Sequence, residues 1–414
     1  MRVLIIAGGF PTPEKPDELV FVYNQVCQLA QHENITMIVP VPVFLFSKKG
    51  IYIREKRNFK PSENLIFKVY FTNFYIPFGK LGIYFYAYSQ FLSVLLTVLL
   101  HRIKIDIIHG HFLYPEGFVA VLLSKLLNKA VINTAHGSDL LVYTTKKNRV
   151  NARIRFTLRQ SDKIICVANM LREKAVHFGA EPERIKVIPN GVDTEVFSIS
   201  AIETARKTTG LDLNTKIVLF IGQLIKRKNV HILLESIAQI VHSMVDESSH
   251  RLSVSGERLS VNTEHQTPNT EHRFVILGEG ILKEQLRHRA IELGIENLVQ
   301  FIGAKENTEI PVWINSADLI CLPSLSEGLP CVLIESLACG VPVVATRVGG
   351  IAEIIQNKDL GLLVPSGNAK ELALAIMSAL EKDWDRKKIR EYALAKYDWK
   401  TVTQQILTQY QTLH

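Results

Sequence analysis

The sequence predicts an α/β protein made of two doubly wound domains, each with a parallel sheet covered by helices. Its 414 residues exceed what one hydrophobic core usually organises. Short apolar runs alternate with helix-length segments, which is the pattern of parallel strands joined by crossover helices. The alternation stops at a Pro-Asn-Gly break at residues 189–191 and then restarts, so this break separates two domains.

Apolar runs mark the expected strands. They are residues 2–8, 35–41, 106–111, 130–137, 162–168 and 184–193 before the break, and 216–222, 274–280, 298–303, 318–323 and 342–350 after it. The helices expected between them include 228–243, 281–293, 332–339 and 368–381. We therefore expect an N-terminal domain at 1–195 and a C-terminal domain at 196–398, facing a central cleft where a ligand binds.

One stretch, residues 246–273, does not fit this alternation. It repeats Arg-Leu-Ser-Val at 251 and 258 and Asn-Thr-Glu-His at 262 and 269, both with a spacing of seven residues. Polar residues fill most positions and no apolar seam persists, so a coiled coil is not indicated. We expect a low-complexity insertion that loops out before the strand at 274.

The formal charge of +8 is unevenly distributed. Residues 1–190 carry 25 Lys and Arg against 13 Asp and Glu, whereas residues 191–414 carry 23 against 27. A basic half indicates an anionic partner, either a membrane surface or a phosphorylated substrate, or else a solvated face without a partner. No nucleic-acid-binding motif accompanies the charge, so we expect no nucleic-acid partner.

Residues 81–100 contain no charged side chain and have the nominal length of a membrane-spanning helix. Polar residues dilute the segment, and a span would separate parts of one sheet, so we expect a buried or interfacial helix instead. The five cysteines form no Cys-x-x-Cys pair, and the opening apolar run is too short for a signal peptide. These features predict a cytoplasmic protein, with association at the inner face of the membrane left open.

Two glycines, Gly8 and Gly9, follow the first strand. A turn without side chains allows a ligand to approach the backbone closely. The pattern is not the Gly-x-Gly-x-x-Gly of dinucleotide enzymes, so no nicotinamide cofactor is expected. We expect no other cofactor.

The strongest signal is the segment SLSEGLPCVLIESLACGVPVVAT at 324–346. It places Glu327 and Glu335 eight residues apart, on either side of the start of a helix. The free backbone N–H groups and partial positive charge of a helix N-terminus suit a diphosphate. Here those amides come from about Cys331 and Val332, because Pro330 has no N–H.

These motifs resemble those of the retaining glycosyltransferases of family 4, which have the GT-B fold of two facing Rossmann-like domains. The likeness runs through HGHFLYPEG (109–117), NTAHGSDL (133–140), IPNGVD (188–193), FIGQLIKRKNV (220–230) and the glutamate pair, in the family's order. The first two are similar to bacterial members that build cell-surface polysaccharides. The resemblance implies transfer of a sugar from a nucleotide diphosphate sugar, with UDP favoured over GDP or ADP, to a saccharide or lipid-linked acceptor.

The resemblance also implies roles for residues of the C-terminal domain. Glu327 contacts the donor sugar near its reacting carbon, Glu335 accepts hydrogen bonds from the ribose hydroxyls, and Lys228 neutralises the departing diphosphate. Gln223 stands where the family often has an Arg, so one positive charge is missing there. The backbone near Gly303 completes the donor site.

Lys226 or Arg227 can replace the missing charge. The alternative is that both are ordinary exposed basic residues without a role in the site. In the N-terminal domain the resemblance places His136 and Gly9 at the cleft, near the donor sugar. It further implies that a final helix within 399–414 packs back on the first domain.

No metal is expected. His109 and His111 point to one face of a strand, but no third ligand has suitable spacing. Asp383-Trp384-Asp385 mimics the Asp-x-Asp of metal-dependent glycosyltransferases but lies in a charged region expected to be helical.

No carboxylate is placed as a nucleophile. The resemblance therefore implies that the departing phosphate oxygen helps to deprotonate the acceptor on the same face, with retention of configuration. A nucleotide-sugar epimerase, a phosphorylase and a non-catalytic sugar- or nucleotide-binding module remain as alternatives.

Overall fold

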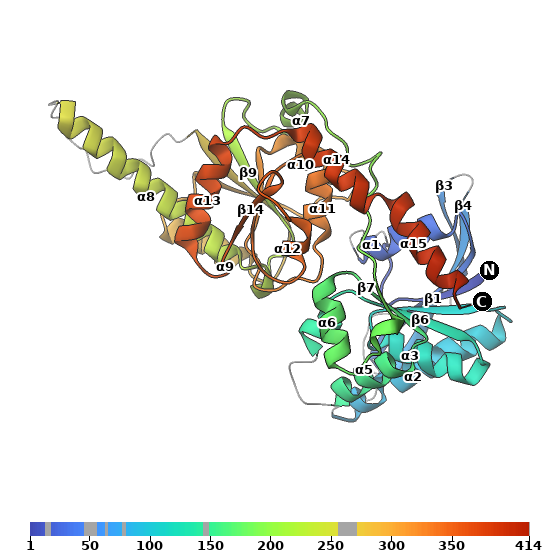
Figure 1. Cartoon of the computed structure of the whole chain (residues 1–414). Coiled ribbons are helices and arrows are strands. Elements are labelled where there is room, and N and C mark those ends of the chain that lie inside the picture. The colour runs from blue at the N-terminus through green and yellow to red at the C-terminus, as the bar shows by residue number, and fades with distance from the viewer. Residues whose placement is uncertain are drawn as a thin grey trace. The chain divides into compact units, whose positions relative to one another are not determined.

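The computed structural model describes residues 1–12, 18–44, 56–62, 65–76, 80–143, 149–255 and 271–413. The chain divides into two compact units (Figure 1). The N-terminal unit comprises Met1–Gly191 together with Tyr397–His414, and the C-terminal unit comprises Val192–Lys396. The expected boundary of 195 lies four residues after the observed one.

The N-terminal sheet has the strand order β3-β4-β2-β1-β5-β6-β7-β8 in the described part of the chain. All neighbours pair in parallel except β3 and β4, which are antiparallel. The strands are β1 (Arg2–Ile6), β2 (Asn34–Phe44), β3 (Lys56–Ser62), β4 (Leu65–Ile76), β5 (Ile107–His111), β6 (Ala130–Ala135), β7 (Lys163–Cys166) and β8 (Ile185–Val187).

Helices cover both faces of this sheet. They are α1 (Val20–Leu29), α2 (Lys80–Leu100), α3 (Glu116–Leu127), α4 (Ser138–Leu141), α5 (Arg149–Gln160), α6 (Asn169–His177) and α15 (Trp399–Gln411). On β1, Val3 and Ile5 pack in the core formed with α1 and α15, whereas Leu4 and Ile6 pack in the core formed with α2 and α3. A strand buried on both faces needs a continuous apolar run, which explains the sequence of β1.

The C-terminal sheet is parallel throughout, with the order β11-β10-β9-β12-β13-β14 among the described residues. Its strands are β9 (Lys216–Ile221), β10 (His272–Leu277), β11 (Val299–Gly303), β12 (Leu319–Leu322), β13 (Val343–Thr346) and β14 (Gly361–Val364). Its helices are α7 (Ile202–Thr209), α8 (Val230–Ser255), α9 (Lys283–Glu292), α10 (Ile310–Ser316), α11 (Cys331–Ala338), α12 (Ile351–Ile354), α13 (Ala369–Glu381) and α14 (Arg386–Tyr397).

The prediction of two doubly wound Rossmann-like domains is confirmed. Three strands, β3, β4 and β14, had not been predicted. The sequences of β3 and β4 mix basic, aromatic and polar residues, and β14 has only four residues, so none of the three forms a distinct buried run.

The expected start of the insertion at residue 246 is wrong. Helix α8 continues to Ser255, because no Gly or Pro interrupts the sequence between Val230 and Gly256. At the other end, β10 already begins at His272. The rest of the expected insertion, residues 256–270, lies outside the described residues.

The C-terminal helix α15 belongs to the N-terminal unit. Trp399, Val402, Ile406 and Tyr410 are buried in the same core as β1 and α1. Within the described ranges, no helix is both long and apolar enough to cross a lipid bilayer.

Candidate active site

The C-terminal sheet changes direction between β9 and β12. The chain proceeds from β9 to β10 and β11 on one side and from β12 to β13 and β14 on the other, and β9 pairs with β12. Ligands of such sheets bind where this reversal occurs, at the carboxyl ends of the strands. Lys228 follows β9 at this edge, and Glu327 follows β12.

Lys228 and Glu327 form an ion pair. Lys228 Nζ donates to Glu327 Oε1 over 2.7 Å, and Ser324 Oγ donates to the same oxygen over 2.7 Å. Only 4% of Glu327 is exposed, and the side chain of Lys228 is 13% exposed. The two predicted residues, 99 positions apart in the sequence, are therefore brought together with their charges balanced.

The loop that carries Glu327 is fixed by backbone contacts on both sides. Leu325 N donates to the carbonyl of Arg227 over 2.8 Å, and Asn229 Nδ2 donates to the carbonyl of Pro323 over 3.1 Å. Gly350 N donates to the carbonyl of Gly328 over 2.9 Å. The protein's own contacts thus hold the carboxylate in position, which is the kind of preorganisation that electrostatic catalysis uses.

Gly349 leaves no room for a side chain beside this loop. Its φ is +56°, and a Cβ atom would lie 1.8 Å from the carbonyl oxygen of Glu327. We expect Gly349→Ala to displace Glu327. On the hypothesis that Glu327 acts on the substrate, turnover should fall by about tenfold or more, because small misplacements of catalytic groups have large effects. The matched control is Gly367→Ala, where φ is +80° and no atom lies within 4 Å of the added Cβ.

Steady-state kinetics and thermal melting of the two glycine variants test this expectation. Both variants place an alanine at a positive φ, which destabilises the folded state, so both should melt at a lower temperature than the wild type. Equal turnover in the two variants would contradict the proposed role of the Gly349 contact.

Helix α11 begins at Cys331, four residues after Glu327, and Pro330 caps it without a side-chain hydrogen bond. Glu335 lies in the second turn and is partly buried. Burial raises the pKa of this carboxyl group to about 7. In the described part of the chain, no hydrogen bond or ion pair holds the Glu335 carboxylate, in contrast to Glu327.

Glycines line the carboxyl edge of the same sheet. Gly222, Gly278 and Gly303 end or follow β9, β10 and β11, and all have positive φ angles. A Cβ on Gly278 would lie 1.9 Å from the carbonyl oxygen of Gly222, so the two turns pack backbone to backbone. Only Gly303 had been predicted here. Gly222 and Gly278 could have been identified from the sequence, because a glycine ends or follows each of three successive strands.

The basic residues near the pair are arranged unequally. Gln223 is exposed at the end of its turn, and Lys226 is also exposed. Arg227 lies closer, with Nη1 3.8 Å from Glu327 Oε2. Of the two candidates to replace the charge missing at Gln223, Arg227 therefore has the better position.

In the N-terminal sheet the chain reverses between β1 and β5, which are adjacent. Three histidines stack beside this point. The ring centroids of His109 and His111 are 4.5 Å apart, with an angle of 24° between the ring planes. Those of His111 and His136 are 5.3 Å apart, with an interplanar angle of 13°. His109 bonds to Tyr410 Oη over 2.7 Å and to Thr134 Oγ1 over 2.8 Å, which links α15 to the stack.

His136 bonds to His111 through Nε2 and Nδ1, 3.0 Å apart. Burial, with the neighbouring His111, lowers the pKa of His136 well below its ordinary value, and burial lowers that of His111 to about 3. Both rings are therefore neutral at pH 7, so one donates and the other accepts. The outer nitrogens, His111 Nε2 and His136 Nδ1, are buried and have no hydrogen-bond partner among the residues that the structure describes. One of these two carries a hydrogen and the other a lone pair.

Two buried carboxylates near this edge had not been predicted as site residues. Glu116 begins α3, is 6% exposed and accepts from Gln90 Nε2 over 3.3 Å, and burial raises its pKa to about 7. A Cβ on Gly8 would lie 2.4 Å from Glu116 Oε1, so the first of the two glycines makes room for this carboxylate. The space beside Gly9 is filled by Glu18 and Leu19.

Asp139, the second buried carboxylate, accepts from the backbone N–H groups of Leu113, Gly137 and Leu140 over 2.9 to 3.1 Å. It thereby ties the turn after His136 to the turn after His111. The motifs at 109–117 and 133–140 had been recognised, but the contact between Glu116 and Gly8 depends on strand order and was not visible in sequence.

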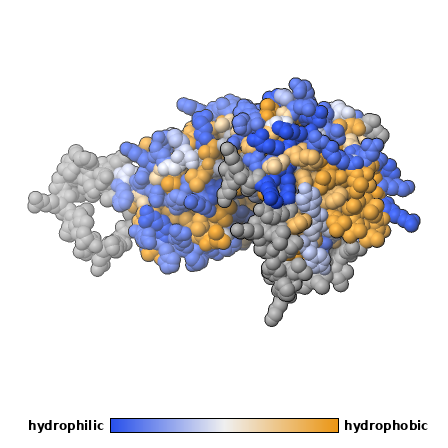
Figure 2. Space-filling view, turned by 90° about the horizontal axis from the view of Figure 1, so that it is seen from below, coloured by the Kyte–Doolittle hydropathy of each residue, from blue (hydrophilic) through white to orange (hydrophobic). Residues whose placement is uncertain are grey.

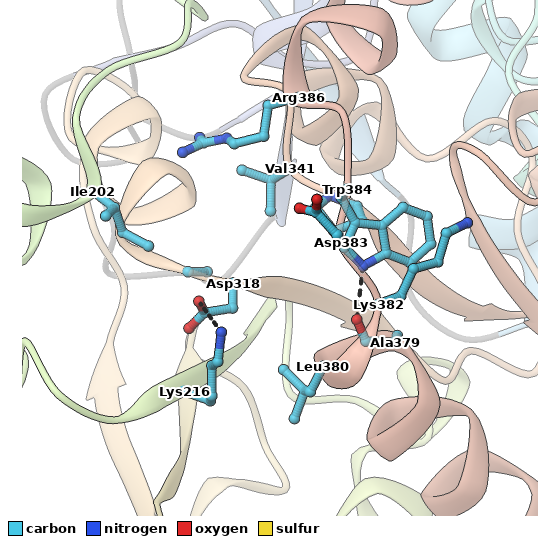
Figure 3. Close-up of a pocket in the computed structure, with 12 residues that line it drawn as sticks. Ile202, Lys216, Asp318, Val341, Ala379, Leu380, Lys382, Asp383, Trp384 and Arg386 are labelled. Carbon is cyan, nitrogen blue, oxygen red and sulfur yellow. Dashed lines mark hydrogen bonds and ion pairs between the residues drawn. The ribbon is translucent and has the colours of Figure 1, made fainter.

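A cavity of about 170 Å³ lies at the opposite edge of the C-terminal sheet. Lys216 and Asp318 line it at the amino ends of β9 and β12 (Figure 3). Pro342, just before β13, also lines it. Asp318 is already paired with Arg206 over 2.6 Å and with Lys216 over 3.7 Å. This edge is not where doubly wound sheets bind ligands.

Asp383 and Trp384 also line this cavity. They lie between α13 and α14, so the expectation that the Asp-x-Asp mimic is helical is wrong. Asp385 accepts from the N–H groups of Lys387 and Lys388, both over 3.1 Å, and thus caps α14. Among the residues with described positions, no group of three or more His, Cys, Asp or Glu is arranged to hold a metal ion.

Comparison with known protein families gives two matches. The model described as Glycosyl transferases group 1 matches residues 201–396, and the model described as Glycosyltransferase Family 4 matches residues 52–196. Together they cover most of both units. The glutamate pair and Lys228 lie in the first match, and the three histidines lie in the second.

Individual relatives are distant. A D-inositol 3-phosphate glycosyltransferase of Corynebacterium glutamicum is 28% identical over 240 residues, which are 56% of this chain and 53% of that protein. The chain thus spans about half the length of this relative. TuaC of Bacillus subtilis, provisionally described as a teichuronic acid biosynthesis glycosyltransferase, is 26% identical over 91% of this chain and 88% of its own length.

Solved structures share the fold over the whole chain. Sucrose-phosphate synthase from Thermosynechococcus elongatus has a TM-score of 0.77 at 18% identity and is covered to 98%. HepE from Anabaena has a TM-score of 0.70 at 18% identity and is covered completely. These likenesses show the GT-B fold. The two family matches, which together cover residues 52–196 and 201–396, show that the chain belongs to the family 4 glycosyltransferases.

Proposed function

We propose that the protein transfers a sugar from a nucleotide diphosphate sugar to a saccharide acceptor, with retention of anomeric configuration, in the synthesis of a cell-surface polysaccharide. The observation that carries this proposal is the ion pair between Lys228 and Glu327 beside the N-terminus of α11, at the point where the C-terminal sheet reverses. A partly buried cation beside the N-terminus of a helix is suited to a diphosphate.

In this proposal the diphosphate lies at the amides of about Cys331 and Val332. Lys228, helped by Arg227, neutralises the leaving phosphate as its bond to the sugar breaks. Glu327 exchanges its contact with Lys228 for contacts with the sugar, while Glu335 accepts hydrogen bonds from the ribose. Gln223 and the backbone near Gly303 contribute hydrogen bonds to the donor. The positive charge comes from the protein, so the proposal requires no metal.

No carboxylate acts as a nucleophile in the proposed reaction. The anomeric carbon loses the phosphate oxygen and gains the acceptor oxygen on the same face, and the proton of the acceptor hydroxyl passes to the departing phosphate. The nucleotide diphosphate therefore leaves with that proton, and the atoms balance without a further reactant.

The N-terminal unit contributes His136 and Gly9 in the proposed reaction. The outer nitrogen of His136 offers either a hydrogen or a lone pair to a sugar hydroxyl, depending on which histidine of the pair donates to the other. His111 therefore determines the tautomer that His136 presents. We further propose that the acceptor is carried on a lipid and that the protein works in the cytoplasm, at the inner face of the membrane.

A thermal-shift panel of UDP-, GDP- and ADP-sugars tests donor binding. We expect a UDP-sugar to raise the melting temperature, since a ligand at 100 times its dissociation constant adds about 2.7 kcal/mol of stability. UDP and UDP-glucose are the first probes, because HepE structures of the same fold contain them. Failure of all three classes to shift melting would contradict the proposal. Donor isomerisation without acceptor, or phosphate-dependent glucan cleavage, would identify an epimerase or a phosphorylase instead.

The raised pKa of Glu335 predicts a pH-dependent affinity for the donor. The group is protonated below its pKa of about 7 and must ionise to accept two ribose hydroxyls. We expect UDP-glucose to bind more tightly as the pH rises through 7, and Glu335→Gln to remove this dependence. UDP-glucose is preferred to UDP because its diphosphate stays fully ionised throughout this range.

The same pKa predicts the effect on stability without ligand. The unfolded carboxyl group ionises near 4.5, whereas the folded one keeps its proton up to about 7, so the folded state binds more protons in between. The Glu335 carboxyl group therefore makes its full contribution to the free energy of unfolding below pH 4.5. That contribution is lost as the pH rises from 4.5 to about 7. Chemical denaturation at several pH values should show a smaller loss in Glu335→Gln. Equal pH slopes in the two proteins would exclude a raised pKa at this residue.

A further inference from the structure

Helix α2 is apolar on two opposite sides. One side, with Ala87, Val94 and Val98, is buried between the helix and the N-terminal sheet. The opposite side exposes five large apolar residues at spacings of three and four: Phe85 (52%), Tyr88 (48%), Leu92 (55%), Leu96 (39%) and Leu99 (56%). We call these five residues the α2 stripe. A helix that is apolar all round normally has something covering each side.

The α2 stripe is part of a larger apolar area. Figure 2 shows a broad orange area on the N-terminal unit, at the right of the view, bordered by blue. Leu100, which ends α2, and Leu126, on the neighbouring α3, are each 59% exposed. Large contiguous apolar surfaces on soluble proteins mark binding sites for proteins or membranes.

The charges around the stripe have one sign. Residues 80–160 contain eleven Lys and Arg but only three Asp and Glu. The three acids offer no exposed negative charge, since Glu116 and Asp139 are buried and Asp106 is paired with Arg2 over 2.5 Å. The segment that carries the stripe is therefore basic, and we call its exposed Lys and Arg the basic border.

One basic group lies directly beside the stripe, and four more are exposed at the ends of α2 and α3. The guanidinium carbon of Arg153 is 5.2 Å from the ring centre of Tyr88. Arg102 and Lys104, which follow α2, are exposed, as are Lys125 and Lys129 on and after α3. Apolar and aromatic side chains with a border of Lys and Arg are the composition of helices that lie in the membrane interface.

We propose that the α2 stripe docks on an anionic phospholipid bilayer. Leucines and aromatic rings enter the headgroup boundary, and the basic border contacts the lipid phosphates. A second copy of the chain fits less well, because a symmetric contact would place two basic borders against each other. The inference deepens the proposed function, since it specifies the surface through which a lipid-carried acceptor is reached.

Vesicle flotation of the full chain tests the proposal. We expect binding to phosphatidylcholine vesicles that contain phosphatidylglycerol, little binding to phosphatidylcholine alone, and loss of binding at about 1 M salt, where the screening length falls to about 3 Å. The variant Leu92→Glu with Leu99→Glu should bind about tenfold more weakly or worse. Leu374→Glu, at a residue of α13 that is 62% exposed, is the matched control and should bind like the wild type.

A second pair of variants tests the charge. Arg102→Glu with Lys125→Glu should weaken binding to anionic vesicles, whereas Lys370→Glu with Lys387→Glu, both exposed in the C-terminal unit, should not. Wild-type binding that is indifferent to lipid charge and salt would overturn the proposal. Unchanged vesicle binding by the leucine variant would also overturn it. The same holds if the wild type does not bind vesicles but forms a dimer that the leucine substitutions dissociate. The comparison of vesicles with and without phosphatidylglycerol uses the wild-type protein alone, so it does not depend on whether any variant folds.

Donor binding separates this inference from the proposed function. The UDP-glucose thermal shift should be the same in the wild type and the leucine variant, since neither leucine belongs to the C-terminal unit. A normal shift without vesicle binding contradicts the docking surface alone. Vesicle binding without any nucleotide shift contradicts the proposed donor and leaves the docking surface supported.

Discussion

Glu327→Gln will lower the rate of sugar transfer by about 100-fold or more, while the protein stays folded. The amide oxygen of Gln can still accept from Lys228 Nζ and Ser324 Oγ, which both donate to Glu327 Oε1 over 2.7 Å. The negative charge beside the developing positive charge of the sugar is lost. The effect should therefore fall on kcat rather than on donor affinity.

Initial rates with saturating donor, together with a thermal melt, check this expectation. Glu391→Gln, at an exposed residue of α14 in the same unit, controls for the loss of one carboxylate. A Glu327→Gln protein that turns over like the control would show that this carboxylate does not act on the sugar.

Lys228→Met will reduce both stability and transfer. Glu327 is 4% exposed, so removing Lys228 leaves a buried carboxylate with Ser324 as its remaining close donor and Arg227 at 3.8 Å. Breaking such a pair costs on the order of 3 kcal/mol. Transfer should fall by about 100-fold or more, because the departing diphosphate loses its nearest cation.

The double variant Lys228→Met, Glu327→Gln separates the two effects. Stability should recover in part, since no unpaired charge remains buried, whereas transfer should not recover. Urea unfolding and initial rates of the four proteins complete the cycle. Additive stability changes would mean that the two side chains do not interact in solution.

The sequence predicted the fold of both units, and the placement of Glu327 and Glu335 around the start of α11, better than the contacts within the N-terminal cluster. The strands with continuous apolar runs, such as β1 and β9, are visible in sequence because both of their faces are buried. Likewise, Glu327 and Glu335 surround a helix start that Pro330 marks. Local patterns of this kind can be recognised without knowing which strands are neighbours in the sheet.

The N-terminal cluster depends on register between strands. The i, i+2 spacing placed His109 and His111 on one face of β5, and the rings do stack. That His136 bonds to His111 follows from the parallel pairing of β5 with β6, in which His111 is opposite Thr134. Glu116 was missed for a related reason, because its neighbour Gly8 follows β1 and is more than a hundred residues away in the sequence.

We propose that the diphosphate of the donor lies at the N-terminus of α11, between Lys228 and Glu335. A crystal structure of the complex with UDP would locate it. We expect the diphosphate within hydrogen-bond distance of Lys228 Nζ and of the α11 amides, and the ribose hydroxyls at Glu335. UDP bound elsewhere, for example in the cavity beside Lys216 and Arg386, with Lys228 still paired to Glu327, would contradict it.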